Sequence, residues 1–206
     1  MSTTSRDRAQ RLLDEHGRTF ADACGIAVAK GSPSVLWQLL VASHLLSSRI
    51  SAELAVRAAR ELRTAFPTAQ RLVDAGAGEV HDALDRGDYL RKRRTAAMLV
   101  DTAEHCLERW DGDLRRLRAE AAEADDPAGR AAELLQEFNG VGPVGAEVFL
   151  REVQVAWEEL RPFAGERALA QARALRLPTD PGRLAALVDE DDVPRLMAAL
   201  VRRGLS

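Results

Sequence analysis

Apolar residues recur along most of the chain at the three- and four-residue spacing of an amphipathic helix. After a Ser-Pro-Ser start at 32–34, Val35, Leu36, Leu39 and Leu40 share one helical face. The same spacing predicts further helices at about 51–66, 68–75, 79–84, 88–109, 113–123, 181–188 and 192–203, and another that begins at 125–127. No run alternates apolar and polar residues over the length of a strand, so the sequence predicts an all-α protein.

Residues that favour helix starts and breaks divide this pattern. Ser51 and Thr68 precede two predicted helices, and we expect Asp88 to cap the long helix at 88–109. The Gly76-Ala77-Gly78 segment is expected to separate two short helices.

The order of the predicted helices suggests two lobes. Residues 34–127 are expected to form a six-helix-type barrel lobe, and residues 1–33 plus 128–206 a second lobe built from both termini. A first helix within residues 1–33 needs apolar partners. The C-terminal helices offer them at Leu184, Leu187, Leu196 and Leu200.

The stretch 134–149 predicts a helix, a tight Gly-Val-Gly turn and a second helix, within a hairpin at 131–157. Gly140 and Gly142 allow positive φ angles and the close approach of a ligand, and Pro143 suits the first turn of a helix. Backbone N–H groups at a helix start have no partner in their own helix and favour an anion. The stretch therefore suits a phosphate, although a plain αα-hairpin without a ligand fits the same residues.

Charge restricts where a nucleic acid could bind. The net charge of the 206-residue chain is −3 and its pI is near 5.9, so any such binding must come from a local patch. The segment 86–94 has a local charge of +4. Asp88 is its acidic residue, and its basic residues are Arg86, Arg91, Lys92, Arg93 and Arg94. A solvated helical turn is the alternative interpretation. The acidic runs 120–126 and 189–192 would repel DNA, which should lie on the opposite side.

Cysteine and histidine usage indicates no metal site. Cys24 and Cys106 lie in apolar helical patterns and are expected to be reduced core thiols. Two cysteines cannot supply the four thiolates of an iron–sulfur cluster, and the four histidines have no metal-ligand spacing. No apolar run reaches the roughly 18 residues of a membrane span. We expect a cytoplasmic protein, associated with the nucleoid if it binds DNA.

Three segments together resemble a known family. The hairpin, with apolar residues at Leu135, Phe138, Val141 and Phe149, resembles the helix–hairpin–helix motif of DNA-binding proteins. Residues 39–50 (Leu-Leu-Val-Ala-Ser-His-Leu-Leu-Ser-Ser-Arg-Ile) are similar to the leucine-rich helix of the endonuclease III family of base-excision repair DNA glycosylases. Residues 89–94 are similar to a segment of that family in which a lysine lies at the start of the helix that precedes the hairpin. The resemblance covers roughly 30–175 and implies a two-lobed all-α glycosylase-like fold.

The resemblance implies double-stranded DNA, intact, damaged or abasic, as the partner, with a repair protein as a further candidate. One phosphate would lie on the hairpin at Gly140, Val141, Gly142 and Gly145. Arg91, Lys92 and Arg93 would hold others on the opposite lip of a cleft between the lobes. Arg49 replaces a glutamine that probes the extrahelical space in the family; it could wedge into a duplex or form an ion pair. The motif also implies a monovalent cation on the hairpin carbonyls.

The reactive side chains of the family do not match. Val144 stands in place of the lysine that forms a Schiff base in bifunctional members, so we expect no lysine-based lyase activity. Phe163 stands in place of an aspartate that moves protons during base loss. A shift of a few residues in the alignment would bring Glu159 or Glu166 to that place. The C-terminal cysteine cluster is absent from the sequence.

Three functions therefore stay open. The first is a DNA-binding relative that is catalytically degenerate. The second is an active monofunctional DNA N-glycosylase with a relocated carboxylate, Glu159 or Glu166, either of which could instead be a solvated helix-face or cap residue. The third is a helical structural or interaction protein that does not bind DNA. The sequence leaves open whether the protein is an enzyme.

Overall fold

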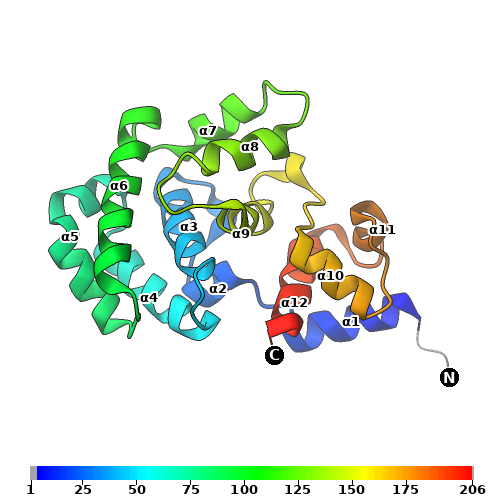
Figure 1. The fold of residues 1–206 in the computed structure, drawn as a ribbon. Coiled ribbons are helices and arrows are strands. Elements are labelled where there is room, and N and C mark those ends of the chain that lie inside the picture. Colours follow the sequence, from blue (N-terminus) through cyan, green and yellow to red (C-terminus); the bar gives the residue numbers. More distant parts are fainter. Residues whose placement is uncertain (1–3, 206) are drawn as a thin grey trace.

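The computed structural model describes residues 4–205, and within that range the regular structure is helical, with no strand (Figure 1). The prediction of an all-α fold is confirmed. The α-helices are α1 (Ser5–His16), α2 (Phe20–Cys24), α3 (Pro33–Leu46), α4 (Ala52–Ala65), α5 (Ala69–Arg86), α6 (Lys92–Trp110), α7 (Leu114–Ala121), α8 (Pro127–Leu135), α9 (Pro143–Val153), α10 (Glu166–Ala174), α11 (Pro181–Ala185) and α12 (Val193–Leu205). Short 3₁₀ helices are η1 (Val28–Lys30), η2 (Glu158–Leu160) and η3 (Glu190–Asp192).

Buried apolar side chains form two cores. The larger core draws on α2 to α9, and the smaller one on α1, α10, α11 and α12, which stand together on the right of Figure 1. Leu12 of α1 and Leu196 and Leu200 of α12 share the smaller core, as expected for the first helix. The hairpin helices contribute Leu134 and Phe149 to the larger core. The division into lobes at 127/128 stays a prediction.

Several helices begin where the sequence places a capping side chain. Ser51 and Thr68 accept hydrogen bonds from the backbone N–H groups of Leu54 and Arg71. These bonds satisfy first-turn donors that have no partner within the helix. Gly76 has φ 71° and ψ 174°, and this non-helical residue interrupts α5 where two helices were predicted.

The prediction for Asp88 is wrong, because the long helix α6 begins at Lys92. Asp88 lies in a left-handed turn (φ 56°), and its carboxylate pairs with Arg57 at 3.1 Å. Packing on both sides fixes this turn. A Cβ at Gly87 would lie 2.5 Å from the Cα of Ala58, and the Tyr89 side chain is buried.

The cysteines lie in the interior, as predicted, and the tryptophans lie there too. Cys24 and Cys106 are buried free thiols, and burial raises the pKa of each to about 12. Trp37, Trp110 and Trp157 are buried in the larger core. None of the helices between residues 4 and 205 is long and apolar enough to cross a membrane.

Candidate functional site

The hairpin consists of α8, a turn at 136–142 and α9. Gly140 has φ 82°, and a Cβ there would lie 1.8 Å from the Cε of Met98, so both conformation and space favour glycine. Gly142 has φ −90°, and a Cβ there would meet nothing within 4 Å. Gly140 therefore shapes the turn, whereas Gly142 leaves open space in front of α9.

The N-terminus of α9 presents unpaired backbone donors. The first hydrogen bond of the helix runs from the N–H of Ala146 to the carbonyl of Gly142 at 3.0 Å. The N–H groups of Gly142, Val144 and Gly145 donate to no backbone carbonyl in residues 4–205. Gly142 and Val144 are exposed, and Gly145 is buried. An anion in front of Gly142 would meet these amides and the positive end of the helix dipole.

The four hairpin residues predicted to hold a phosphate differ in accessibility. Gly140 and Gly142 are exposed, whereas Val141 and Gly145 are buried. The N–H of Val141 already donates to the carbonyl of Phe138 at 3.0 Å. The exposed donors therefore centre on Gly142.

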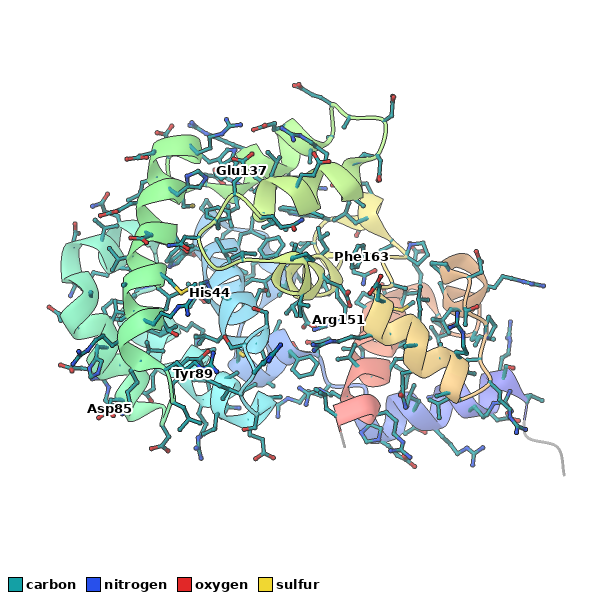
Figure 2. All side chains as sticks on the ribbon, in the orientation of Figure 1. His44, Asp85, Tyr89, Glu137, Arg151 and Phe163 are labelled. Carbon is teal, nitrogen blue, oxygen red and sulfur yellow. The ribbon has the colours of Figure 1, made fainter. Side chains whose placement is uncertain are left out.

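Side chains of α3 and α6 pack against the turn. His44 of α3 and Met98 of α6 contact Gly140, and Ser47, the C-cap residue of α3, lies against Gly145. The Nδ2 of Asn139 donates to the carboxylate of Asp101 on α6 at 2.7 Å. Figure 2 shows His44 between α3 and α6, beside the hairpin segment. The turn is thus held by side chains from two helices distant in sequence.

His44 is a buried titratable group under the hairpin. Its side chain is 3% exposed, and burial lowers its pKa to about 4. Its Nδ1 has no hydrogen-bond partner in the described part of the chain. The imidazole is therefore neutral at physiological pH.

The basic segment at the start of α6 is partly neutralised. Lys92 pairs with Asp85 and lowers the pKa of that carboxyl group, and Arg86 pairs with Glu61 at 3.2 Å. Three exposed arginines of this segment form no ion pair with any residue from 4 to 205: Arg91, Arg93 and Arg94. A shallow depression is lined by these arginines with His81, Leu90 and Lys92. Leu90 is 72% exposed.

Arg94 belongs to the basic segment, but the resemblance did not place it among the residues expected to hold a phosphate. It precedes Met98 by four residues and Asp101 by seven, which puts it on the face of α6 that supports the hairpin. The rise from Arg94 to Met98 is about 6 Å. The helical spacing could have identified this residue, had the contact between Met98 and Gly140 been known.

Arg49 lies exposed after the C-terminus of α3 and forms no ion pair with the part of the chain that the structure describes. The geometry leaves its side chain accessible from solvent. Its role as a wedge in a duplex stays a prediction.

The carboxylates considered for catalysis have different surroundings. Glu159 accepts two hydrogen bonds of 2.6 Å from Arg118, which lowers the pKa of its carboxyl group. It lies in η2, which follows the C-terminal end of α9, whereas Gly142 lies at the N-terminal end of that helix. Glu166 is exposed at the start of α10, where its backbone N–H donates to Glu147 at 3.2 Å. The backbone of Phe163 is tied on both sides to the side-chain amide of Gln154.

No group of three His, Cys, Asp or Glu side chains within residues 4–205 is arranged to hold a metal ion. A cation on the hairpin carbonyls stays a prediction.

The helical arrangement, in which the hairpin helices α8 and α9 belong to the larger core, is an endonuclease III-like fold. Among solved structures that share it is "Structure of a Trapped Endonuclease III-DNA Covalent Intermediate: Estranged-Adenine Complex", with a TM-score of 0.52. The match has 15% sequence identity and covers 98% of this chain and 85% of that one. No protein-family model matches the sequence, and no curated protein matches it. The predicted resemblance is thus confirmed for the fold.

Proposed function

We propose that this chain binds double-stranded DNA and that the N-terminus of α9 holds one backbone phosphate. The observation that carries the proposal is the set of unpaired backbone N–H groups in front of the open space at Gly142. Such donors and the helix dipole favour a phosphate. The endonuclease III of similar fold is complexed with DNA, which supports the same partner here.

The exposed arginines supply further phosphate contacts. Arg91, Arg93 and Arg94 surround the start of α6, and Arg94 lies on its hairpin-facing side. We expect Lys92 to contribute less than Arg94 because Asp85 already pairs with it. Since the whole chain is acidic, binding should depend on this local charge and weaken as salt increases.

Catalysis is a separate question from binding. Val144 carries no amine, so we expect no Schiff-base chemistry at the hairpin. Borohydride trapping of a covalent DNA adduct linked to the hairpin would contradict this. A catalytically degenerate binding protein and a monofunctional glycosylase are both compatible with a hairpin that lacks a lysine.

The substitution Gly142→Asp tests the phosphate site. The backbone at Gly142 (φ −90°, ψ −172°) suits a helix N-cap, and Asp is a favoured cap. Its carboxylate would occupy the free amides and repel a phosphate. We expect unchanged or higher thermal stability and at least about tenfold weaker DNA binding, or about 1.4 kcal/mol, measured by fluorescence anisotropy with a labelled duplex at low salt.

Matched variants separate charge from steric effects. Gly142→Ala fits the open space and should bind DNA within about twofold of wild type. Gly142→Asn caps the helix without a charge, so its DNA affinity should lie between those of Gly142→Ala and Gly142→Asp.

The substitution Arg94→Glu tests the contribution of the exposed arginines. It should weaken DNA binding and reduce the slope of log affinity against log salt by about one. Arg173→Glu, on α10, is the control and should leave the DNA affinity and the salt slope unchanged. If wild-type protein has no measurable affinity at low salt, the proposal fails and the structural or interaction role remains.

A further inference from the structure

Asn139 is the only asparagine in the sequence, and the residue that follows it is Gly140. Both residues are exposed. The N–H of Val141 donates to the carbonyl of Phe138 at 3.0 Å, which closes a tight turn over 138–141, and Gly140 has φ 82° at the third position. This is the glycine conformation of a type II turn. The one asparagine therefore lies in a solvent-facing turn, directly before a residue that has no side chain.

The backbone nitrogen of Gly140 is the group next to this asparagine that is open to reaction. Its N–H donates to no backbone carbonyl in residues 4–205, so no backbone hydrogen bond holds it in place. A side chain at position 140 would shield this nitrogen, and glycine has none. Asparagine is among the chemically labile residues, because a following backbone nitrogen can close a five-membered ring with its Cγ. The turn thus exposes both partners of that ring closure.

The side chain of Asn139 also fastens the turn to α6. Its Nδ2 donates to the carboxylate of Asp101 at 2.7 Å, and the Oγ1 of Thr102 donates to its backbone carbonyl at 3.4 Å. If an oxygen replaced Nδ2, two carboxylates would face each other across the first of these contacts. Like charges at such a distance repel each other. Conversion of the amide to an acid would therefore remove a bond to α6 and put a repulsion in its place.

Asn139 lies close to the amides proposed to hold a phosphate. Gly142 follows it by three residues, and three residues of extended chain span at most about 11 Å. At 0.1 M ionic strength the Debye length is about 10 Å, so salt screens a charge at position 139 only partly from a phosphate at Gly142. A negative charge there would oppose the anion that the positive end of α9 favours.

We propose that Asn139 is a self-modification site and that its conversion to an acid releases DNA from the hairpin. The nitrogen of Gly140 loses its proton to the solvent and forms a bond to the Cγ of Asn139. The Cγ–Nδ2 bond breaks, its electron pair stays with the nitrogen, and the nitrogen takes up a proton and leaves as ammonia. A water molecule then opens the five-membered imide, which leaves an aspartate or an isoaspartate at position 139.

Both products disturb the phosphate site. The aspartate sets a second carboxylate against Asp101. The isoaspartate does the same from an altered main chain, which is longer by one carbon, about 1.5 Å. Because Gly142 directly follows the turn, either change displaces or repels a phosphate bound there. This inference rests on the proposed function, in which the hairpin holds a DNA phosphate.

Peptide mapping of the aged protein tests the modification. Full-length protein is incubated at mildly alkaline pH and cut with trypsin, and peptide 131–151 is compared with a synthetic peptide of the same sequence. We expect an amide-to-acid mass gain at Asn139, at a rate within about tenfold of that in the synthetic peptide, because an exposed turn opens at little free-energy cost. Gln136, in the same peptide, is the internal control and should remain an amide. No gain at Asn139 in the folded protein, when the synthetic peptide is fully converted, would overturn the proposal.

Fluorescence anisotropy with a labelled duplex at low salt tests the consequence. Aged wild-type protein should bind DNA at least about threefold more weakly than fresh protein. Fresh Asn139→Asp should show the same loss without ageing. Asn139→Gln keeps an uncharged amide that would have to close a larger ring, so its DNA affinity should not change during the same incubation.

A second substitution separates charge repulsion from loss of the fold. Asn139→Asp combined with Asp101→Ala removes one of the two facing carboxylates, and we expect this double variant to recover part of the DNA affinity. Asp101→Ala alone is the reference for the comparison. Thermal unfolding of each variant shows whether the fold is kept.

Equal DNA affinity of fresh and aged wild type, with conversion at Asn139 established, would overturn the inference and leave the proposed function intact. So would an aged Asn139→Gln that loses as much affinity as the aged wild type. No binding by fresh wild type would overturn the proposed function itself, and the release of DNA with it.

Discussion

His44 is the residue whose protonation the fold constrains most clearly. It comes from the last turn of α3, and its ring lies against Gly140. Burial is the cause of its low pKa of about 4, and no charged side chain offsets it. The folded protein thus keeps a neutral imidazole at pH values where an unfolded chain would protonate it.

Stability should fall as the pH decreases, and His44 should account for part of the change. The folded pKa lies below the ordinary value of 6.5, so the unfolded state binds more protons between about pH 6.5 and 4. Going from pH 7 to pH 4 should lower the free energy of unfolding by about 3 kcal/mol through this residue. In His44→Leu this part of the loss should disappear, as measured by urea unfolding at both pH values.

His81→Gln, on α5, is the control and should keep the wild-type difference between the two pH values. An identical pH dependence in His44→Leu and wild type would show that His44 is not the responsible group.

At the scale of elements, the hairpin turn depends on unequal glycines. Gly140 has a positive φ and a crowded Cβ position, whereas Gly142 has neither. Gly145 is intermediate, because a Cβ there would lie 3.1 Å from Val141 and 3.3 Å from the Oγ of Ser47. The turn therefore needs glycine for folding at one place and for ligand access at another.

Gly140→Ala should lower the free energy of unfolding by about 1–3 kcal/mol, because the new side chain adds φ strain and meets Met98 and His44. Gly142→Ala should change it by less than about 0.5 kcal/mol. Urea unfolding monitored by tryptophan fluorescence measures both. Equal effects of the two substitutions would contradict the geometry of the turn.

At the scale of the whole molecule, a buried ion pair connects the two cores. The Nε of Arg151 on α9 donates to Glu152 at 3.1 Å, and the other oxygen of Glu152 accepts the N–H of Ala21 at 2.8 Å. The guanidinium of Arg151 lies 5.2 Å from the ring centre of Phe20, which belongs to the smaller core. Figure 2 shows Arg151 between the larger body and the helices on the right.

Glu152→Ala should lower the free energy of unfolding by about 3–5 kcal/mol, because it leaves the buried charge of Arg151 and the N–H of Ala21 without a partner. Thermal and urea unfolding measure this change. Glu158→Ala, whose side chain is 75% exposed, should stay within about 0.5 kcal/mol of wild type. A small effect of Glu152→Ala would show that the connection between the cores does not depend on this pair.

The sequence by itself determined the features that depend on neighbouring residues. Ser51 and Thr68 mark helix starts because a capping side chain reaches an N–H three residues away. The glycines and Pro143 mark the hairpin because their backbone preferences are intrinsic. Helical periodicity likewise identified the all-α class, since burial of one helix face is visible in the spacing of apolar residues.

Only the tertiary structure decided the features that join distant segments. The helix expected at Asp88 starts later because Gly87 and Tyr89 pack against other helices. The pairing of Lys92 with Asp85 depends on how α5 meets α6. A Cβ at Gly165 would lie 2.0 Å from the Cδ of Glu147, eighteen residues earlier, and no local pattern indicates this contact. Such contacts are set by how the helices pack, and local sequence preferences do not encode them.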